Sequence, residues 1–172
     1  MFGSRSHRTR DSPTAVGLTG SAVGGGMALA AACDLRIASV PARFGAQFIR
    51  LGVSGCDMGI SYTLPRLVGA SRAGELIMTP RQIDAEEAER IGLVSRVVPE
   101  EALLQTAVEL SENLCENSQF APEMTKQVFT INLGAPSLDA AIVLENRTQI
   151  LAGTSGDFAR ASAALAARPG RK

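Results

Sequence analysis

The apolar residues of the N-terminal half form short runs separated by polar or glycine-rich segments. Residues 14–19 form an apolar run that predicts a strand, and the segment Gly20–Gly26 predicts a turn after it. Residues 27–32 predict a helix, because alanine is the best helix former and none of these residues is β-branched. Residues 33–39 alternate between apolar and polar positions, which predicts a second strand.

Beyond residue 40 the spacing of apolar residues becomes increasingly helical. Residues 42–53 predict a short strand and a loop. From Asp57 onward apolar residues recur at helical spacing until Gly69, and Pro65 is expected to kink or weaken one turn. Asp84 is predicted to cap a helix, because acidic residues fill the turn that follows it. The other predicted elements are a helix over 70–78, a strand over 93–98 and almost continuous helix over 100–168.

This order of elements predicts an α/β fold in which short β/α units precede a helical C-terminal region. We divide the chain into a disordered tail over 1–13, a core over 14–99 and a helical region over 100–172. The tail is rich in serine and arginine, as transit peptides are, but it is short and lacks the apolar residues of an amphipathic face. An unstructured end is therefore the favoured interpretation.

Composition and charge narrow the class of protein. The chain is 45% hydrophobic and 20% charged, which is ordinary for a soluble globular protein. Its 17 basic residues balance its 17 acidic ones. This balance argues against nucleic acids or membrane surfaces as partners, since both attract a concentrated positive field. No apolar run is long enough to cross a bilayer.

The cysteines and the single histidine limit the chemistry further. Cys33, Cys56 and Cys115 lie far apart and match neither a disulfide framework nor a zinc spacing. Reduced thiols and a cytoplasmic location are therefore expected. His7 belongs to the tail, so a catalytic or metal-binding histidine in the folded body is excluded, and no metal site is expected.

The segment Gly20–Gly26 places bare backbone between a predicted strand and a predicted helix. Such a turn brings N–H groups close to a ligand, and the helix N-terminus adds positive potential. A Walker A loop would need Lys and then Ser or Thr where Met27 and Ala28 stand, and the dinucleotide fingerprint G-x-G-x-x-G is not matched. Two interpretations stay open on these residues alone: an oxyanion-binding turn, or glycines that only permit close strand-to-helix packing.

A wider pattern runs through four segments, GSAVGGGMALAAACDLRIAS, ARFG, LPRLVGASRAGELIM and IDAEEAERIGLVSRVVP. Together they resemble the crotonase superfamily, the enoyl-CoA hydratase/isomerase family, and the resemblance covers about residues 14–168. It implies a fold of repeated ββα units with C-terminal helices that pack trimers. It also implies acyl-CoA thioester substrates, with coenzyme A as part of the substrate and no separate cofactor.

The resemblance assigns roles to residues around the glycine turn. It implies that the backbone N–H of Gly25 is one of two donors to the thioester oxygen, which favours the oxyanion interpretation of the turn. Tyr62 is either a hydrogen-bond donor in the pocket or a residue that packs within its helix. The substrate-binding positions that the resemblance implies are Ala22, Gly24, Ala28, Phe48 and Tyr62.

Two features of the family are missing from this sequence. Nothing before residue 14 resembles the N-terminal half that supplies the other oxyanion N–H, so we expect a truncated reading frame, a degraded gene or one piece of a split protein. The resemblance places the two hydratase glutamates at Ala28 and Phe48, and neither side chain can transfer a proton. The usual hydratase and isomerase mechanisms are therefore not expected from these two positions.

Asp57 is an acidic residue where the family's hydratases carry a small one. By the resemblance it falls where the 4-chlorobenzoyl-CoA dehalogenases carry their aspartate nucleophile, and related isomerases place an acidic group close to this point. This implies an acid/base group or a nucleophile. The other interpretation is that Asp57 caps the following helix. Cys56 beside it is expected to be a buried small apolar residue, because no histidine base accompanies it.

These observations lead to one functional hypothesis and its alternatives. The hypothesis is acyl-CoA thioester chemistry of the enoyl-CoA hydratase/isomerase type, with oxyanion stabilisation of the thioester enolate. The alternatives are a non-catalytic acyl-CoA-binding protein and an inactive fragment of such an enzyme. A homo-oligomer, a trimer or a dimer of trimers, is expected if the fold is completed. The residues implied for the CoA phosphates, or otherwise as solvated surface charges, are Lys126, Arg168, Arg171 and Lys172.

Overall fold

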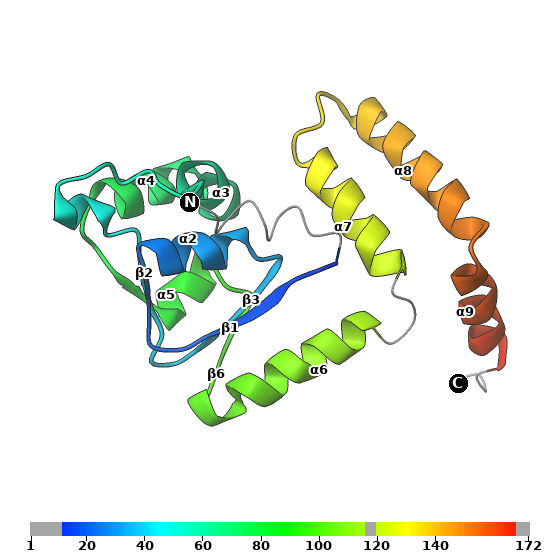
Figure 1. The fold of residues 1–172 in the computed structure, drawn as a ribbon, viewed down its shortest axis with the longest axis horizontal. Helices are drawn as coiled ribbons and strands as arrows, with labels where there is room; N and C mark the ends of the chain where they lie inside the picture. Colours follow the sequence, from blue (N-terminus) through cyan, green and yellow to red (C-terminus); the bar gives the residue numbers. More distant parts are fainter. Residues whose placement is uncertain (1–11, 116–119, 168–172) are drawn as a thin grey trace. The chain divides into compact units, whose positions relative to one another are not determined.

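The computed structural model describes residues 12–115 and 120–167, which belong to two compact units. The first unit contains Thr14–Leu110, and the second contains Ser111–Lys172 together with Asp11–Pro13. Figure 1 shows strands and short helices in the first unit and longer helices in the second. Each unit is described separately below.

The order of the elements confirms the predicted α/β class. Strands and helices are interspersed up to residue 98, and the elements described beyond it are all helices. Within the described ranges, no helix is long and apolar enough to cross a membrane. The tail predicted over 1–13 lies outside the described residues apart from Ser12 and Pro13.

The first sheet consists of three parallel strands in the order β1–β3–β6. β1 (Ala15–Leu18) pairs along its length with β3 (Leu35–Ser39), and β3 pairs with β6 (Arg96–Val98). The carboxylate of Asp34 ties the beginnings of β1 and β3 together. Its Oδ2 accepts hydrogen bonds from the backbone N–H of Thr14 at 2.8 Å and from the Thr14 hydroxyl at 2.9 Å.

A partly buried arginine joins β3 to the segment that precedes β6. The guanidinium of Arg36 donates to the carbonyl oxygen of Leu93 at 2.6 Å and to that of Cys33, and burial lowers the pKa of this guanidinium. The N–H of Ser95 donates to the carbonyl oxygen of Arg36 at 2.9 Å. The observed strand is therefore shorter than the predicted strand over 93–98. The first three residues of the predicted strand form a turn that is held by hydrogen bonds to Arg36, and they do not pair with a neighbouring strand.

The second sheet has the order β2–β4–β5. β2 (Ser21–Val23) runs parallel to β4 (Arg43–Gly45), which runs antiparallel to β5 (Ile83–Asp84). β2 lies inside the segment predicted to be a turn, and α2 (Gly25–Ala32) begins at Gly25 rather than Met27. The prediction was wrong because pairing with β4 orders these three residues, and no local pattern reports that pairing.

The core of the first unit is packed around α2. The helix α3 (Ile60–Val68) lies beside α2, and α4 (Ala70–Met78) packs against α3 (Figure 1). Removing apolar side chains from water at about 25 cal/mol per Å² drives this packing. The α2 residues that are buried are Met27, Ala28, Ala30, Ala31 and Ala32. Other large side chains with less than 2% exposure are Phe44, Ile37, Ile60, Leu64, Leu76, Ile83 and Leu93.

The helix α5 (Ala85–Arg90) has the predicted cap. Oδ1 of Asp84 accepts the N–H of Glu87 at 2.8 Å, which confirms Asp84 as the N-cap. Arg81 donates to both carboxylate oxygens of Glu87 at 2.8 Å, and this hydrogen bond raises the pKa of Arg81. The 3-10 helix η2 (Glu100–Ala102) then leads into the C-terminal helices.

The predicted C-terminal helices are confirmed within the described ranges. α6 (Leu103–Cys115) carries the chain into the second unit, where α7 (Phe120–Asn132) packs against α8 (Leu138–Gly153). α8 contacts α9 (Gly156–Ala167), which follows it (Figure 1). A groove of about 350 Å³ is lined by residues of α7 and α8.

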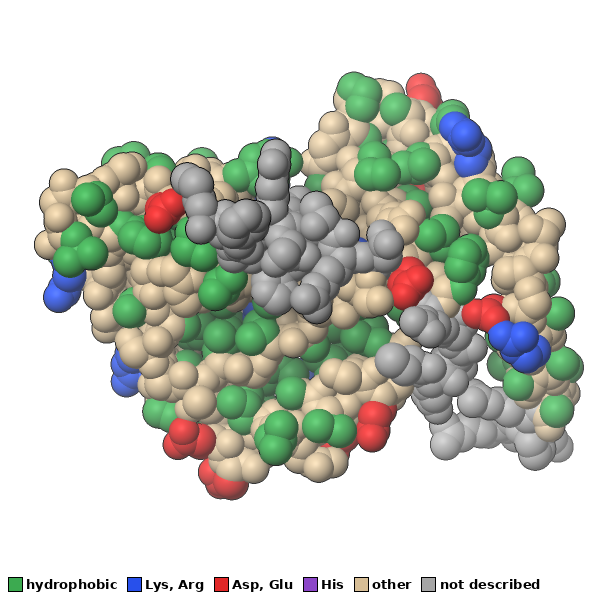
Figure 2. All heavy atoms as spheres, viewed as in Figure 1, with side chains coloured by type: hydrophobic (Ala, Val, Ile, Leu, Met, Phe, Trp, Pro, Cys, Tyr) green, Lys and Arg blue, Asp and Glu red, His purple; other side chains and the backbone are tan. Residues whose placement is uncertain are grey.

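Many apolar side chains of these helices face solvent, and Figure 2 shows them in green along the visible face of α8 and α9. None of the residues of α8 is buried in the described structure. The exposed side chains include Leu138, Ile150 and Leu151 of α8 at 74%, 69% and 62% exposure, and Leu165 of α9 at 70%. The second unit therefore buries its apolar residues much less completely than the first.

Candidate active site

The chain enters α2 through a backbone conformation that only glycine adopts readily. Gly24 has φ 54° and ψ −120°, and no hydrogen bond from a described side chain caps the helix here. The N–H of Gly24 donates to the carbonyl oxygen of Gly45 at 2.8 Å, and its own carbonyl oxygen accepts the N–H of Ala28 at 3.1 Å. The ends of β2 and β4 thus fix the direction in which α2 begins.

The first two residues of α2 are glycines that are not buried. Gly25 is partly buried and Gly26 is exposed. The first N–H groups of a helix have no acceptor within the helix, and the helix dipole makes them partly positive. The turn contains no acidic residue that would compete for them. An oxygen that carries negative charge can therefore bind here.

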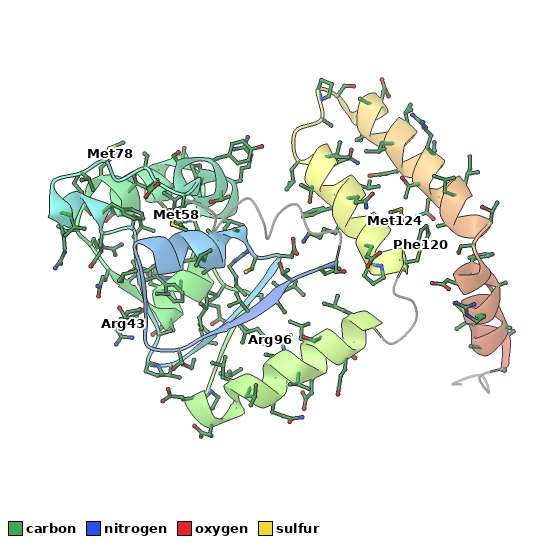
Figure 3. The ribbon with its side chains drawn as sticks, viewed as in Figure 1. Arg43, Met58, Met78, Arg96, Phe120 and Met124 are labelled. Atoms are coloured by element: carbon green, nitrogen blue, oxygen red, sulfur yellow. The ribbon has the colours of Figure 1, made fainter. Side chains whose placement is uncertain are left out.

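Two apolar side chains lie beside this turn, one next to Gly24 and the other next to Gly25. A Cβ added to Gly24 would lie 3.7 Å from Cε1 of Phe48, the first residue of the 3-10 helix η1 (Phe48–Leu51). A Cβ added to Gly25 would lie 3.2 Å from Sδ of Met58, whose side chain is labelled beside α2 in Figure 3. A Cβ added to Gly26 would meet none of the described atoms within 4 Å. The side chains of Phe48 and Met58 therefore cover the turn at Gly24 and Gly25, whereas the space beside Gly26 is open.

Asp57 lies in an exposed loop before α3, and it does not cap that helix. The N-cap is Gly59, at φ 83°, so the capping interpretation of Asp57 was wrong, because the next two residues separate the carboxylate from the helix. Oδ1 of Asp57 accepts the N–H of Met58 at 2.7 Å, and the Asp57 carbonyl oxygen accepts the N–H of Ile60 at 3.0 Å. Asp57 is thus bonded to the residue whose sulfur lies beside Gly25.

The other predicted substrate-binding residues have different surroundings. Ala22 and Ala28 are buried, with 7% and 1% exposure, and Ala22 pairs with Phe44 across β2 and β4. Tyr62 is 51% exposed, and the guanidinium carbon of Arg66 lies 3.5 Å from the centroid of its ring. The structure brings Gly24, Phe48 and the Asp57 turn to one place, whereas the described ring contact of Tyr62 is on its own helix. A role of Tyr62 in binding stays a prediction.

Two further residues have environments opposite to those expected. Cys56 is exposed, because it belongs to the loop before α3 rather than to a packed element. Lys126 is only 8% exposed, and its Nζ donates to the carbonyl oxygen of Ser12 at 3.0 Å, so it is not a solvated surface charge. The remaining basic candidates, Arg168, Arg171 and Lys172, lie outside the described residues.

Sequence reasoning did not single out Met58, although the structure places it at the glycine turn. Its only local signal is that it stands in a loop between an aspartate and a glycine. Its contact with Gly25 joins segments that are distant in the chain, so no local pattern could report it. Among the described residues, no group of three or more His, Cys, Asp or Glu side chains could hold a metal ion.

Comparison with known proteins identifies the family to which these elements belong. The sequence model described as Enoyl-CoA hydratase/isomerase matches residues 7–160. The chain therefore belongs to the enoyl-CoA hydratase/isomerase family, within the crotonase superfamily, and the resemblance seen in its sequence is confirmed. The protein of Mycobacterium tuberculosis H37Rv named "Probable enoyl-CoA hydratase EchA12" is 43% identical over 138 residues.

Solved structures show the same fold. The enoyl-CoA hydratase of Bacillus anthracis is 31% identical with a TM-score of 0.89, and the match covers 94% of this chain and 62% of that one. A monofunctional enoyl-CoA isomerase of M. smegmatis is 42% identical with a TM-score of 0.73, covering 80% of this chain and 65% of that one. The match to EchA12 covers 80% of this chain and 48% of the relative, so the chain spans about half the length of that curated relative.

Proposed function

We propose that this chain binds acyl-CoA thioesters and stabilises their enolates, as an enzyme of the hydratase/isomerase type. The observation that carries the proposal is the start of α2, where a glycine at φ 54° leads from β2 into a helix whose first two residues, Gly25 and Gly26, are partly buried and exposed, respectively. In this proposal, the N–H of Gly25 donates to the thioester oxygen. Because negative charge grows on that oxygen when an α-proton leaves, the hydrogen bond strengthens in the transition state.

Asp57 is the proposed acid/base residue. The positions where the family resemblance places glutamates hold Ala28 and Phe48, which carry no titratable group. Asp57 is exposed, and the hydrogen bond from Met58 occupies its Oδ1. That bond would orient the carboxylate, while Oδ2 would accept a proton from the acyl chain and return it at another carbon.

The remaining parts of the proposal concern binding and assembly. Ala22, Gly24, Ala28, Phe48 and Tyr62 are proposed to surround the acyl group, with Ala22 and Ala28 as the buried base of the turn. Coenzyme A enters as part of the substrate, and no separate cofactor is proposed. We also propose a cytoplasmic location and a homo-oligomeric assembly, a trimer or a dimer of trimers.

A second candidate function is acyl-CoA binding without catalysis. The observation in its favour is that Ala28 is 1% exposed and Phe48 contributes a ring at Gly24, so both positions are apolar. Such a protein would hold the thioester at the turn and leave it chemically unchanged.

One experiment separates the two candidates. The purified 172-residue chain is incubated with but-2-enoyl-CoA and with but-3-enoyl-CoA, thermal unfolding is recorded, and the thioesters are then separated by chromatography. A ligand that binds only the folded state raises the unfolding midpoint. We expect a raised midpoint and conversion of at least one thioester. A raised midpoint without conversion supports the binding protein, and an unchanged midpoint with no conversion contradicts both.

The role of Asp57 is tested in the same assay with Asp57→Asn. We expect a loss of turnover of about 10²–10⁴-fold, because the amide cannot transfer the proton. Asp139→Asn in α8 is the matched control, because this exposed aspartate lies in the second unit. Full turnover by the Asp57 variant would rule out the proposed acid/base role.

A further inference from the structure

The backbone of Met58 adopts a conformation that side-chain-bearing residues rarely take. Its φ is 50°, in the left-handed region, and the glycine that follows has φ 83°. The N–H of Met58 donates to Oδ1 of Asp57 at 2.7 Å, which closes the turn. Backbone outliers of this kind persist where the surroundings hold them, and they cluster at functional sites.

This conformation directs the methionine side chain to the start of α2. Sδ of Met58 lies 3.2 Å from the point where a Cβ of Gly25 would stand, and the rest of the side chain packs against the core of the first unit (Figure 3). The side chain is only partly buried, so it also contributes to the surface around the turn. The sulfur of Met58 therefore lies tightly against the position that a Cβ of Gly25 would occupy.

That space adjoins the place where the acyl group must lie if the proposed function holds. A thioester oxygen bound to the N–H of Gly25 would be about 3 Å from that nitrogen. The carbonyl carbon and the α-carbon follow that oxygen along the acyl chain. A side chain that covers the Cα of Gly25 therefore lies within reach of the substituents on the substrate's α-carbon. Phe48 lies beside the preceding glycine, Gly24.

We infer that Met58 is a specificity-determining residue that restricts the site to acyl-CoA thioesters without a branch at the α-carbon. The inference rests on the proposed binding of the thioester oxygen at Gly25. Methionine can occupy the space beside Gly25 because its long, unbranched side chain fills irregular gaps. The hydrogen bond to Asp57 comes from the backbone N–H of residue 58. The size of the side chain at this position can therefore be changed without removing that bond.

The test compares two saturated thioesters with four acyl carbons each, butanoyl-CoA and the α-branched 2-methylpropanoyl-CoA. Neither carries a double bond, so calorimetric titration of the full chain measures binding alone. A methyl group that does not fit a packed pocket costs about 10–200-fold in selectivity. We expect the wild-type chain to bind butanoyl-CoA at least tenfold more tightly. In Met58→Ala we expect the ratio to fall to about threefold or less, mainly because the branched thioester binds better.

Two further variants control for strain and folding. Met58→Leu has a similar volume and should keep the wild-type ratio. Met58→Gly removes the side chain and also releases the strain at φ 50°, so a ratio equal to that of the alanine variant assigns the effect to side-chain volume. Thermal unfolding of each variant shows whether it is folded, and Met58→Gly keeps the comparison with wild type informative if the alanine variant unfolds, because glycine accepts φ 50° without strain.

The possible results distinguish this inference from the proposed function. If wild type binds butanoyl-CoA but Met58→Ala and Met58→Gly both keep the wild-type ratio, Met58 does not determine specificity, and the proposed function stands. If Met58→Leu changes the ratio as much as Met58→Ala, volume is not the cause, and the inference is overturned. If wild type binds neither thioester, the proposed function fails, and the inference fails with it.

Discussion

Two alanine- and leucine-containing helices, α2 and α8, have opposite relations to solvent. The eight residues of α2 include five that are buried, whereas none of the 16 described residues of α8 is buried. α2 lies inside the core of the first unit, while α8 packs on its neighbours with its large side chains partly or fully exposed. The buried helix therefore forms a rigid frame for a backbone site, whereas the other presents an open helix surface.

The largest expected difference between the two helices is the loss of unfolding free energy when an alanine of each is replaced by aspartate. Ala28→Asp in α2 would bury an unpaired carboxylate at a position that is 1% exposed, which we expect to cost about 4 kcal/mol or more. Ala140→Asp in α8 replaces an exposed alanine in the first helical turn, and its effect should stay within about 0.5 kcal/mol. Urea unfolding of both variants checks this prediction. Equal midpoints would mean that α2 is not the core helix described here.

A smaller difference in stability is expected when a glycine at the start of α2 and a glycine at the end of α8 are each replaced by alanine. Gly24→Ala forces a Cβ onto φ 54° and ψ −120°, which we expect to cost about 1–3 kcal/mol. At Gly153, the last residue of α8, a Cβ would meet none of the described atoms within 4 Å, so alanine should stabilise the helix by about 0.5–1 kcal/mol. Thermal unfolding checks this prediction: the midpoint should fall in Gly24→Ala and rise in Gly153→Ala. A stabilising Gly24→Ala would contradict the backbone geometry of the turn.

The smallest difference is expected at the helix caps. Asp84 accepts the N–H of Glu87 at 2.8 Å, and Ser137 accepts the N–H of Ala140 at 3.2 Å. A cap acts locally, so Asp84→Ala and Ser137→Ala should each cost about 1 kcal/mol despite the different burial of the two units. If one cap cost several times more than the other in equilibrium unfolding, tertiary context rather than the cap would set the value.

The features that sequence predicted correctly are those with local causes. The cap at Asp84 and the helices after residue 100 follow from residues that are neighbours in the chain. β2 was missed because only its ladder with β4 orders it, and the buried turn before β6 was missed because it depends on Arg36. In each case the deciding partner is far away in sequence.

The same distinction applies to the candidate site. The glycine turn was predicted as a ligand-binding feature because glycine, strand and helix follow one another directly. The exposure of Cys56 and the contact of Met58 with Gly25 depend on how the loop before α3 folds back on α2. Family resemblance directed attention to Asp57, but the hydrogen bond that joins it to Met58 required the structure.

The central claim is that the N–H of Gly25 stabilises the thioester oxyanion, and a pair of substitutions tests it directly. Gly25→Pro removes this N–H at the first helical position, where proline is well tolerated, and Gly25→Ala adds the same Cβ but keeps the N–H. Both add a Cβ at the point 3.2 Å from Sδ of Met58, so any displacement of Met58 by that Cβ is common to the two variants, and proline additionally carries its ring atoms Cγ and Cδ. We predict similar unfolding midpoints, with acyl-CoA turnover about 10²–10³-fold lower in the proline variant than in the alanine variant. Equal turnover by the two variants would contradict the claim.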